Sequence, residues 1–216
     1  MNSTLRRTPF FAAAALLAVC VAPLSAAPIT FTFTGIVDNV DPALASDFAP
    51  GDAFTMSYTF ESTTPARVGS DSTFAVFDAL TSTDFTLNAY AGSATGSEEI
   101  QVDNDPPFPN VDRYSAGPGA GSTKIGPQVN GLDLASFFVR LDDSTNTVFS
   151  DALILPLSLS LSDFTSAGFA VFFANDIGDI FVVDGHITTL VPEPTSMMLA
   201  LVGVVAVAGY ARRRRV

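Results

Sequence analysis

The sequence predicts an all-β protein: an antiparallel β-sandwich of about ten strands, with an N-terminal signal peptide and a C-terminal transmembrane helix. Apolar and polar residues alternate with period two in several short stretches, which is typical of strands with one buried face. Pro, Gly, Asn and Asp separate these stretches and favour turns there. A β-solenoid, the structural alternative, requires a sequence repeat, and the chain has none.

Three stretches alternate most regularly and are predicted strands: residues 29–34, 54–60 and 157–162. Segments 168–174 and 179–191 are more continuously apolar, so we expect them to be central strands covered on both faces. Weaker strand predictions are 73–77, 84–90, 98–102, 111–115, 136–141 and 147–150. One helical turn is expected at Pro42–Ala45, with Asp41 as its N-cap.

Phenylalanine is the main aromatic residue of the chain, which has 19 Phe and no Trp. We therefore predict a core packed largely with phenylalanine rings. Segments 103–110 and 117–127 interrupt the strand pattern with Pro, Gly and Asp. We expect both to be loops at one end of the sandwich.

The N-terminus has the layout of a secretory signal peptide. Arg6 and Arg7 precede the apolar run 10–22, and small residues follow it, which predicts cleavage by signal peptidase between Ala26 and Ala27. A twin-arginine signal at Arg6-Arg7 and lipidation at Cys20 are alternatives, but the flanking residues fit neither well. Cys20 is the only cysteine, so the processed protein is expected to contain no disulfide.

The C-terminal segment 191–216 has three parts. Pro192, Glu193 and Pro194 come first and favour extended chain. An apolar run follows, and segment 195–211 is predicted to span a membrane, although it is short for this purpose. The cluster Arg212, Arg213, Arg214 and Arg215 is expected to keep its end in the cytoplasm.

This tail resembles the PEP-CTERM protein-sorting family, whose members are processed by exosortases. The resemblance rests on Val191–Ser196, the apolar run and the arginine cluster, and it covers only the tail. It implies export across the inner membrane of a Gram-negative bacterium, temporary anchoring and cleavage near Pro192-Glu193-Pro194. Many relatives are associated with extracellular polysaccharide or biofilm matrix. Such tails are also labelled as the C-terminal domain of ice-binding proteins, but nothing in residues 27–190 predicts ice binding. An ordinary C-terminal anchor is the alternative.

The central segment 27–190 is one predicted extracytoplasmic domain and is strongly acidic. It holds four basic residues against 21 acidic ones, a net charge of about −17. Such a surface repels nucleic acid and anionic lipid headgroups. The charge is expected to serve solubility, cation binding or a loose ionic association with a matrix.

Oxygen-bearing side chains suggest one weak metal site. Asp103, Asn104, Asp105 and Asp112 lie in or next to a predicted loop, and Ca²⁺ prefers such ligands. The residues lack the spacing of an EF-hand, and turns are the simpler interpretation. Residues 142–146 and 175–179 carry similar side chains and are interpreted first as turns, with calcium binding as the alternative for 142–146.

The sequence predicts no catalytic residue. His186 is the only histidine, and no Gly-x-Ser-x-Gly motif occurs, so a serine-hydrolase triad has little support. One histidine without a cysteine offers too few ligands for zinc. A paired-carboxylate glycosidase stays open.

These observations predict an exported, non-enzymatic protein sorted through its tail, and the resemblance implies that it acts at the cell surface or in the matrix, in association with extracellular polysaccharide. Its expected processing enzymes are signal peptidase and exosortase. A calcium-dependent carbohydrate-binding module is the first alternative, and an extracellular hydrolase is the second.

Overall fold

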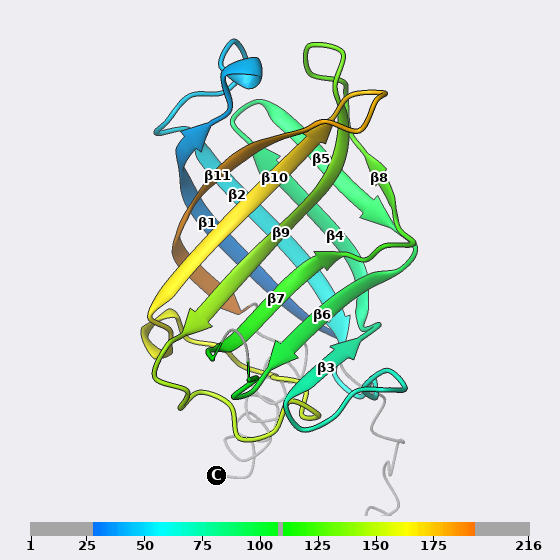
Figure 1. Cartoon of the computed structure of the whole chain (residues 1–216), viewed down its shortest axis with the longest axis vertical. Coiled ribbons are helices and arrows are strands. Elements are labelled where there is room, and N and C mark those ends of the chain that lie inside the picture. Colours follow the sequence, from blue (N-terminus) through cyan, green and yellow to red (C-terminus); the bar gives the residue numbers. More distant parts are fainter. Residues whose placement is uncertain (1–27, 108–109, 193–216) are drawn as a thin grey trace, which may run out of the picture.

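The computed structural model describes residues 28–107 and 110–192, which fold into an antiparallel sheet (Figure 1). Two short 3-10 helices, η1 at Pro42–Leu44 and η2 at Leu161–Asp163, lie in its loops. The strands are β1 Pro28–Val40, β2 Ala53–Glu61, β3 Phe74–Phe77, β4 Leu80–Leu87, β5 Tyr90–Thr95, β6 Glu98–Asp103, β7 Asp112–Pro118, β8 Thr123–Ile125, β9 Asp133–Asp143, β10 Ser166–Ala174 and β11 Ile180–Pro192.

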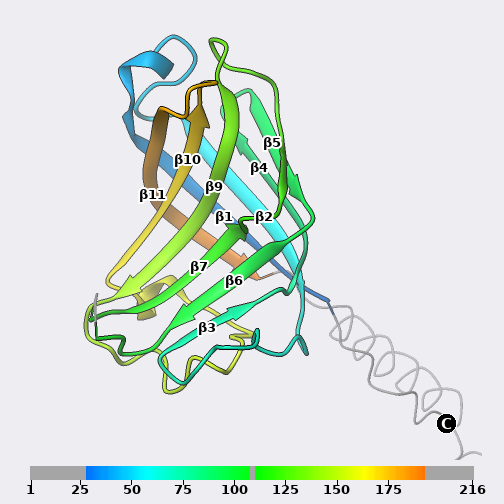
Figure 2. The same cartoon turned by 45° about the vertical axis from the view of Figure 1, so that its right-hand side comes forward.

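All of these strands belong to one sheet in the order β3-β6-β7-β9-β10-β11-β1-β2-β4-β5-β8. The sheet curls strongly into the shape of a half-barrel, so that its two halves face each other (Figure 2). The all-β antiparallel prediction is therefore confirmed, but the arrangement differs from two separate sandwich sheets. Hydrogen bonding continues across the middle because β11 pairs with both β10 and β1.

Register shifts help the sheet to curl, since an extra residue in one strand bends it and increases its twist. They occur at Thr34/Gly35 and Val37/Asn39 in the β1–β11 pair, at Phe172/Phe173 in the β9–β10 pair and at Thr59/Phe60 in the β2–β4 pair. Gly35 also provides space for a ring: a Cβ at this position would lie 3.1 Å from Cε1 of Phe169.

The core lies between the two halves of the sheet and is built largely from phenylalanine, as predicted. Phe54 of β2 stacks on Phe169 of β10, with ring centroids 3.8 Å apart. Phe85 of β4 packs against Phe137 of β9 at 4.5 Å. These ring pairs connect strands that are not neighbours in the sheet order. Apolar packing therefore holds the two halves of the curled sheet together where their strands are not paired.

Most strand predictions are confirmed, but two are wrong. Segment 147–150 forms no strand, and segment 157–162 is loop ending in η2. Its Leu–Ser alternation has no neighbouring strand: Leu157 is 52% exposed, while Leu159 and Leu161 pack only partly against the core. Strands β5 and β8 were not predicted. In β5 the inward position of Gly92 must stay small, because a Cβ there would overlap the ring of Phe85.

The helical turn is confirmed, since the side chain of Asp41 accepts a hydrogen bond from the backbone N–H of Ala43. Strands β10 and β11 are central in the sheet order, as predicted. The expectation that both of their faces are covered is wrong, because outward residues such as Phe172 and Val182, which pair with each other, are only partly buried.

The prediction that the two Pro/Gly-rich segments form loops at one end is also wrong. Segment 103–110 lies at the end of the β6–β7 hairpin where Asp103 pairs with Arg113. Segment 117–127 begins at the other end, where Glu98 pairs with Pro118. Part of the second segment is strand, as β7 extends to Pro118 and β8 begins at Thr123.

Candidate functional site

The two ends of the described domain lie side by side. Strand β1 begins at Pro28 and β11 ends at Pro192, and in this antiparallel pair Phe31 lies opposite Pro192. On its other side, Pro28 lies opposite Glu61, the last residue of β2. We call this end of the sheet the junction end; it is the lower end in Figures 1 and 2.

The Pro-Glu-Pro segment begins inside the sheet. Pro192 is the last residue of β11, so the first proline of this segment lies within the final strand. Proline has no backbone N–H, and it therefore cannot continue the ladder as a donor. The two residues of β11 before Pro192, Leu190 and Val191, lie opposite Phe33 and Thr32. A protease that acts just after Pro192 would have to approach the edge of a folded domain.

The remaining predicted targeting residues lie outside the described residues. They are Ala26, Ala27, Glu193, Pro194, segment 195–211, Arg212, Arg213, Arg214 and Arg215. Within residues 28–107 and 110–192, no helix has the length and apolar character needed to cross a membrane.

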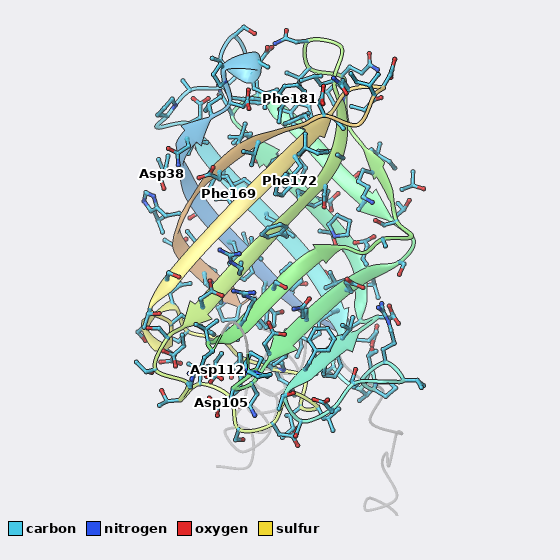
Figure 3. All side chains as sticks on the ribbon, viewed as in Figure 1. Asp38, Asp105, Asp112, Phe169, Phe172 and Phe181 are labelled. Atoms are coloured by element: carbon cyan, nitrogen blue, oxygen red, sulfur yellow. The ribbon has the colours of Figure 1, made fainter. Side chains whose placement is uncertain are left out.

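The structure brings together only part of the proposed calcium set. Asp105 and Asp112 lie close together at the junction end (Figure 3), but the contact runs from the backbone N–H of Asp105 to Oδ1 of Asp112, at 3.0 Å. Asp112 is fully buried, and its Oδ2 accepts hydrogen bonds from the N–H groups of Val148 and Phe149. Asp112 therefore joins two loops.

The other two members of the calcium set are held by different partners. The side chain of Asn104 donates to the carbonyl of Ser72. Asp103 accepts from Gln101, and burial raises the pKa of its carboxyl. In the described part of the chain, no three His, Cys, Asp or Glu side chains are grouped so that they could hold a metal ion. The structure thus gives the calcium prediction no support.

The turn after β9 is held by its own carboxylate, as the turn interpretation of residues 142–146 predicts. The backbone N–H of Thr147 and that of Thr145 both donate to Asp143. These bonds, with one from the Thr145 hydroxyl, lower the pKa of Asp143 to about 2. The side chain of Asn175 plays a similar part in the β10–β11 turn, where it accepts from the N–H of Asp179.

His186 has a charged neighbour on the exposed face of the sheet. Its Nδ1 lies 2.9 Å from each carboxylate oxygen of Asp38, and both side chains are about half exposed. A carboxylate beside an imidazole orients the ring, but catalysis also requires a nucleophile and a site that excludes water. The exposed pair is therefore a surface interaction.

Two buried polar pairs had no signal in the sequence pattern. Tyr58 of β2 and Tyr114 of β7 meet across the core, with their hydroxyl oxygens 2.7 Å apart, and burial raises the pKa of both. Glu98 is buried and accepts a hydrogen bond from the Thr83 hydroxyl. Burial is the main cause that raises the pKa of Glu98. Alternation places these residues inward, but it does not show which of them meet.

The outer face of β7, β9 and β10 carries two adjacent hollows of about 270 and 430 Å³, which share Phe138 and Arg140. The ring of Phe138 lies 5.6 Å from that of Phe172. The small residues Gly117 and Ala170 line the hollows beside these rings. Arg140 and Arg113 both contact the carboxylate of Asp142, at 3.2 and 2.7 Å. This face combines apolar rings with fixed donors and acceptors.

Comparison with known proteins gives one match. Residues 190–215 match the family model described as the PEP-CTERM protein-sorting motif. The match starts within β11, so its first residues are part of the folded sheet. The motif implies an exported protein that is anchored at its C-terminus and processed by an exosortase at the cell envelope. No curated protein and no solved structure matches the chain.

Proposed function

We propose that this chain, which carries the PEP-CTERM protein-sorting motif at residues 190–215, is a non-enzymatic surface or matrix protein of a Gram-negative bacterium. Its curled sheet is the exported cargo, and its partner is extracellular polysaccharide. The observation that carries the proposal is the junction between the domain and the motif, where β11 ends at Pro192.

The proposed mechanism is topological. The signal peptide starts export across the inner membrane, and signal peptidase removes it between Ala26 and Ala27. The apolar segment 195–211 and Arg212–Arg215 then hold the tail in the membrane, because arginines resist translocation. An exosortase cleaves near Pro192-Glu193-Pro194 and releases or transfers the domain.

The domain itself is suited to life outside the cell without disulfides. Its core is continuous between the two halves of the sheet, and such burial is the main source of stability in a domain of this size. The strongly acidic composition favours solubility and disfavours binding to nucleic acid. These properties fit a matrix component.

Cells that lack the exosortase provide the test. We expect the full tail to stay on the protein and the protein to stay in the inner membrane fraction, whereas wild-type cells yield a shortened form outside. As a second test, Arg212–Arg215 are replaced with serine, and we expect this variant to be retained less well in the inner membrane. Identical processing with and without the enzyme would refute the proposal.

Carbohydrate binding is a second candidate function, and the two hollows around Phe138 favour it. Sugar rings stack on aromatic side chains, and planar groups such as the Arg140 guanidinium donate hydrogen bonds to hydroxyl groups. We expect glycan-array binding to be lost in Phe138→Ala and kept in Ile177→Ala, a variant of an exposed residue in the β10–β11 turn. Binding abolished by EDTA would instead assign it to calcium in the acidic loops.

A further inference from the structure

Exposed apolar side chains gather at the junction end of the sheet. Ten large apolar residues are exposed in the described part of the chain, and six of them lie at this end or in its loops. They are Val68, Phe74, Leu153, Ile154, Leu157 and Val191. Soluble surfaces carry single exposed apolar residues at many places, but a concentration at one end points to a contact.

The loops that carry these residues form one continuous surface with the chain ends. Segment 62–73 starts from Glu61, which lies opposite Pro28. Segment 144–165 reaches segment 62–73 through a hydrogen bond from Ala152 N–H to the carbonyl of Ser72, at 3.0 Å. The junction end therefore presents its loops together with the point at which the tail departs (Figure 2).

The length of the tail limits how far this surface can lie from a membrane. Only residues 193–196 separate Pro192 from Met197, the first residue of the apolar run. Five extended Cα–Cα steps reach no more than about 18 Å. Strand β11 has 13 residues and is about 43 Å long. While the tail spans a bilayer, the junction end is therefore held close to its surface.

Segment 144–165 is shaped for such a contact. Its Leu153, Ile154 and Leu157 are 44%, 61% and 52% exposed, and the loop surrounds a hollow of about 390 Å³ lined mainly by apolar side chains. Asp151 and Asp163 lie in the same loop. Because these carboxylates repel anionic headgroups, the matching surface is a bilayer with zwitterionic headgroups.

We propose that segment 144–165 docks into the headgroup region of the bilayer that holds the tail, through its exposed Leu153, Ile154 and Leu157. This inference rests on the proposed function, since it requires a membrane-anchored tail. Docking orients the domain with its junction end toward the membrane and the β10–β11 turn away from it. Pro192, the last residue of β11, is thereby held next to the membrane surface.

The absence of tryptophan from the chain allows a direct test with single reporters. Ile154→Trp places a reporter in the proposed docking loop. Ile177→Trp is the matched control, because it replaces an exposed isoleucine in the turn at the opposite end. The full chain is reconstituted through its tail into phosphatidylcholine vesicles with brominated acyl chains. Resistance to carbonate extraction reports whether the tail is inserted.

We expect the Trp at position 154 to emit at shorter wavelength and to lose about half or more of its fluorescence to the brominated chains, since interfacial side chains reach about 5–10 Å into the headgroup boundary. The Trp at position 177 should be unaffected. If the tail resists carbonate extraction but neither Trp reporter is quenched, the docking proposal is overturned and the proposed function stands. A chain that carbonate extracts would overturn both.

Discussion

At the scale of single residues, the Tyr58–Tyr114 pair joins the two halves of the sheet, because β2 and β7 belong to opposite halves. Its hydroxyl groups are fully buried and bond to each other at 2.7 Å. Removing one hydroxyl leaves the other buried without its partner, which costs about 1–3 kcal/mol. Removing both leaves no unpaired group.

We therefore predict that Tyr58→Phe and Tyr114→Phe each lower the free energy of unfolding by about 1–3 kcal/mol, and that the double variant loses less than the sum. Chemical denaturation of the four proteins measures this coupling. Tyr90→Phe is the control, because no described residue lies within hydrogen-bond reach of the buried Tyr90 hydroxyl. Its stability should be unchanged or higher. Additive losses at Tyr58 and Tyr114 would contradict the pairing.

A second prediction concerns Glu98, whose pKa is raised in the folded state chiefly by burial. Below the unfolded-state pKa the carboxyl is neutral in both states and carries no penalty. As pH rises above that value, the unfolded state loses its proton first, so stability falls until pH passes the folded-state pKa. We expect Glu98→Gln to match the wild type near pH 4 and to melt at a higher temperature at pH 7.

The measurement is a series of thermal melts of wild type and variants from about pH 2 to about pH 8, a range that includes the titration of both carboxyls. A gain of about 1 kcal/mol would raise Tm by about 2–4 °C in a domain of this size. Asp143→Asn should have the opposite effect on stability and lower Tm at neutral pH, because the pKa of Asp143 is lowered to about 2 in the folded state. Its deficit should be present at pH 7 and shrink as pH falls below about 4. A Glu98→Gln variant that is equally destabilised at every pH would rule out the titration argument.

At the scale of elements, Asp112 of β7 connects the loop 104–111 to segment 144–165. Its carboxylate accepts three backbone N–H bonds while fully buried. Hydrogen bonds to charged groups contribute about 1.5–3 kcal/mol each, so we expect Asp112→Ala to lower stability by at least about 3 kcal/mol. Asp176→Ala, in the β10–β11 turn, should change it by no more than about 0.5 kcal/mol.

Hydrogen exchange checks the same prediction locally. In Asp112→Ala the amides of Val148 and Phe149 should exchange faster than in the wild type, because their acceptor is gone. Calorimetry in calcium and in EDTA completes the test: this account expects equal Tm values for the wild type. A Tm that rises with calcium and no longer does so in Asp112→Ala would show that Asp112 binds the ion.

The sequence predicts strands well where alternation coincides with a partner, and poorly elsewhere. Segment 54–60 alternates and pairs on both sides, as β2. Segment 157–162 alternates as clearly but has no strand beside it, and period alone cannot show this. Strand β5 was missed for the opposite reason: it has partners in β4 and β8, but its buried residues Gly92 and Ala94 are too small to give an apolar pattern, and the ring of Phe85 fills the space at Gly92. Packing partners decide both cases.

At the scale of the whole molecule, the sequence predicts the tail better than the shape of the domain. The tail signal is local: Pro192-Glu193-Pro194, an apolar run and four arginines lie together in the chain. The curled sheet depends on pairings between distant strands, such as β1 with β11, and a list of strands does not determine these pairings. The same pairing places both chain ends at the junction end, which no sequence pattern indicated.

The central claim is that residues 27–192 are cargo and that the tail is removed after export. Mass spectrometry of the protein recovered from outside native cells tests it most directly, because it gives both ends of the mature chain. The account predicts an N-terminus at Ala27 and a C-terminus within or just after Pro192-Glu193-Pro194. A mature protein that still carries Arg212–Arg215 would contradict it.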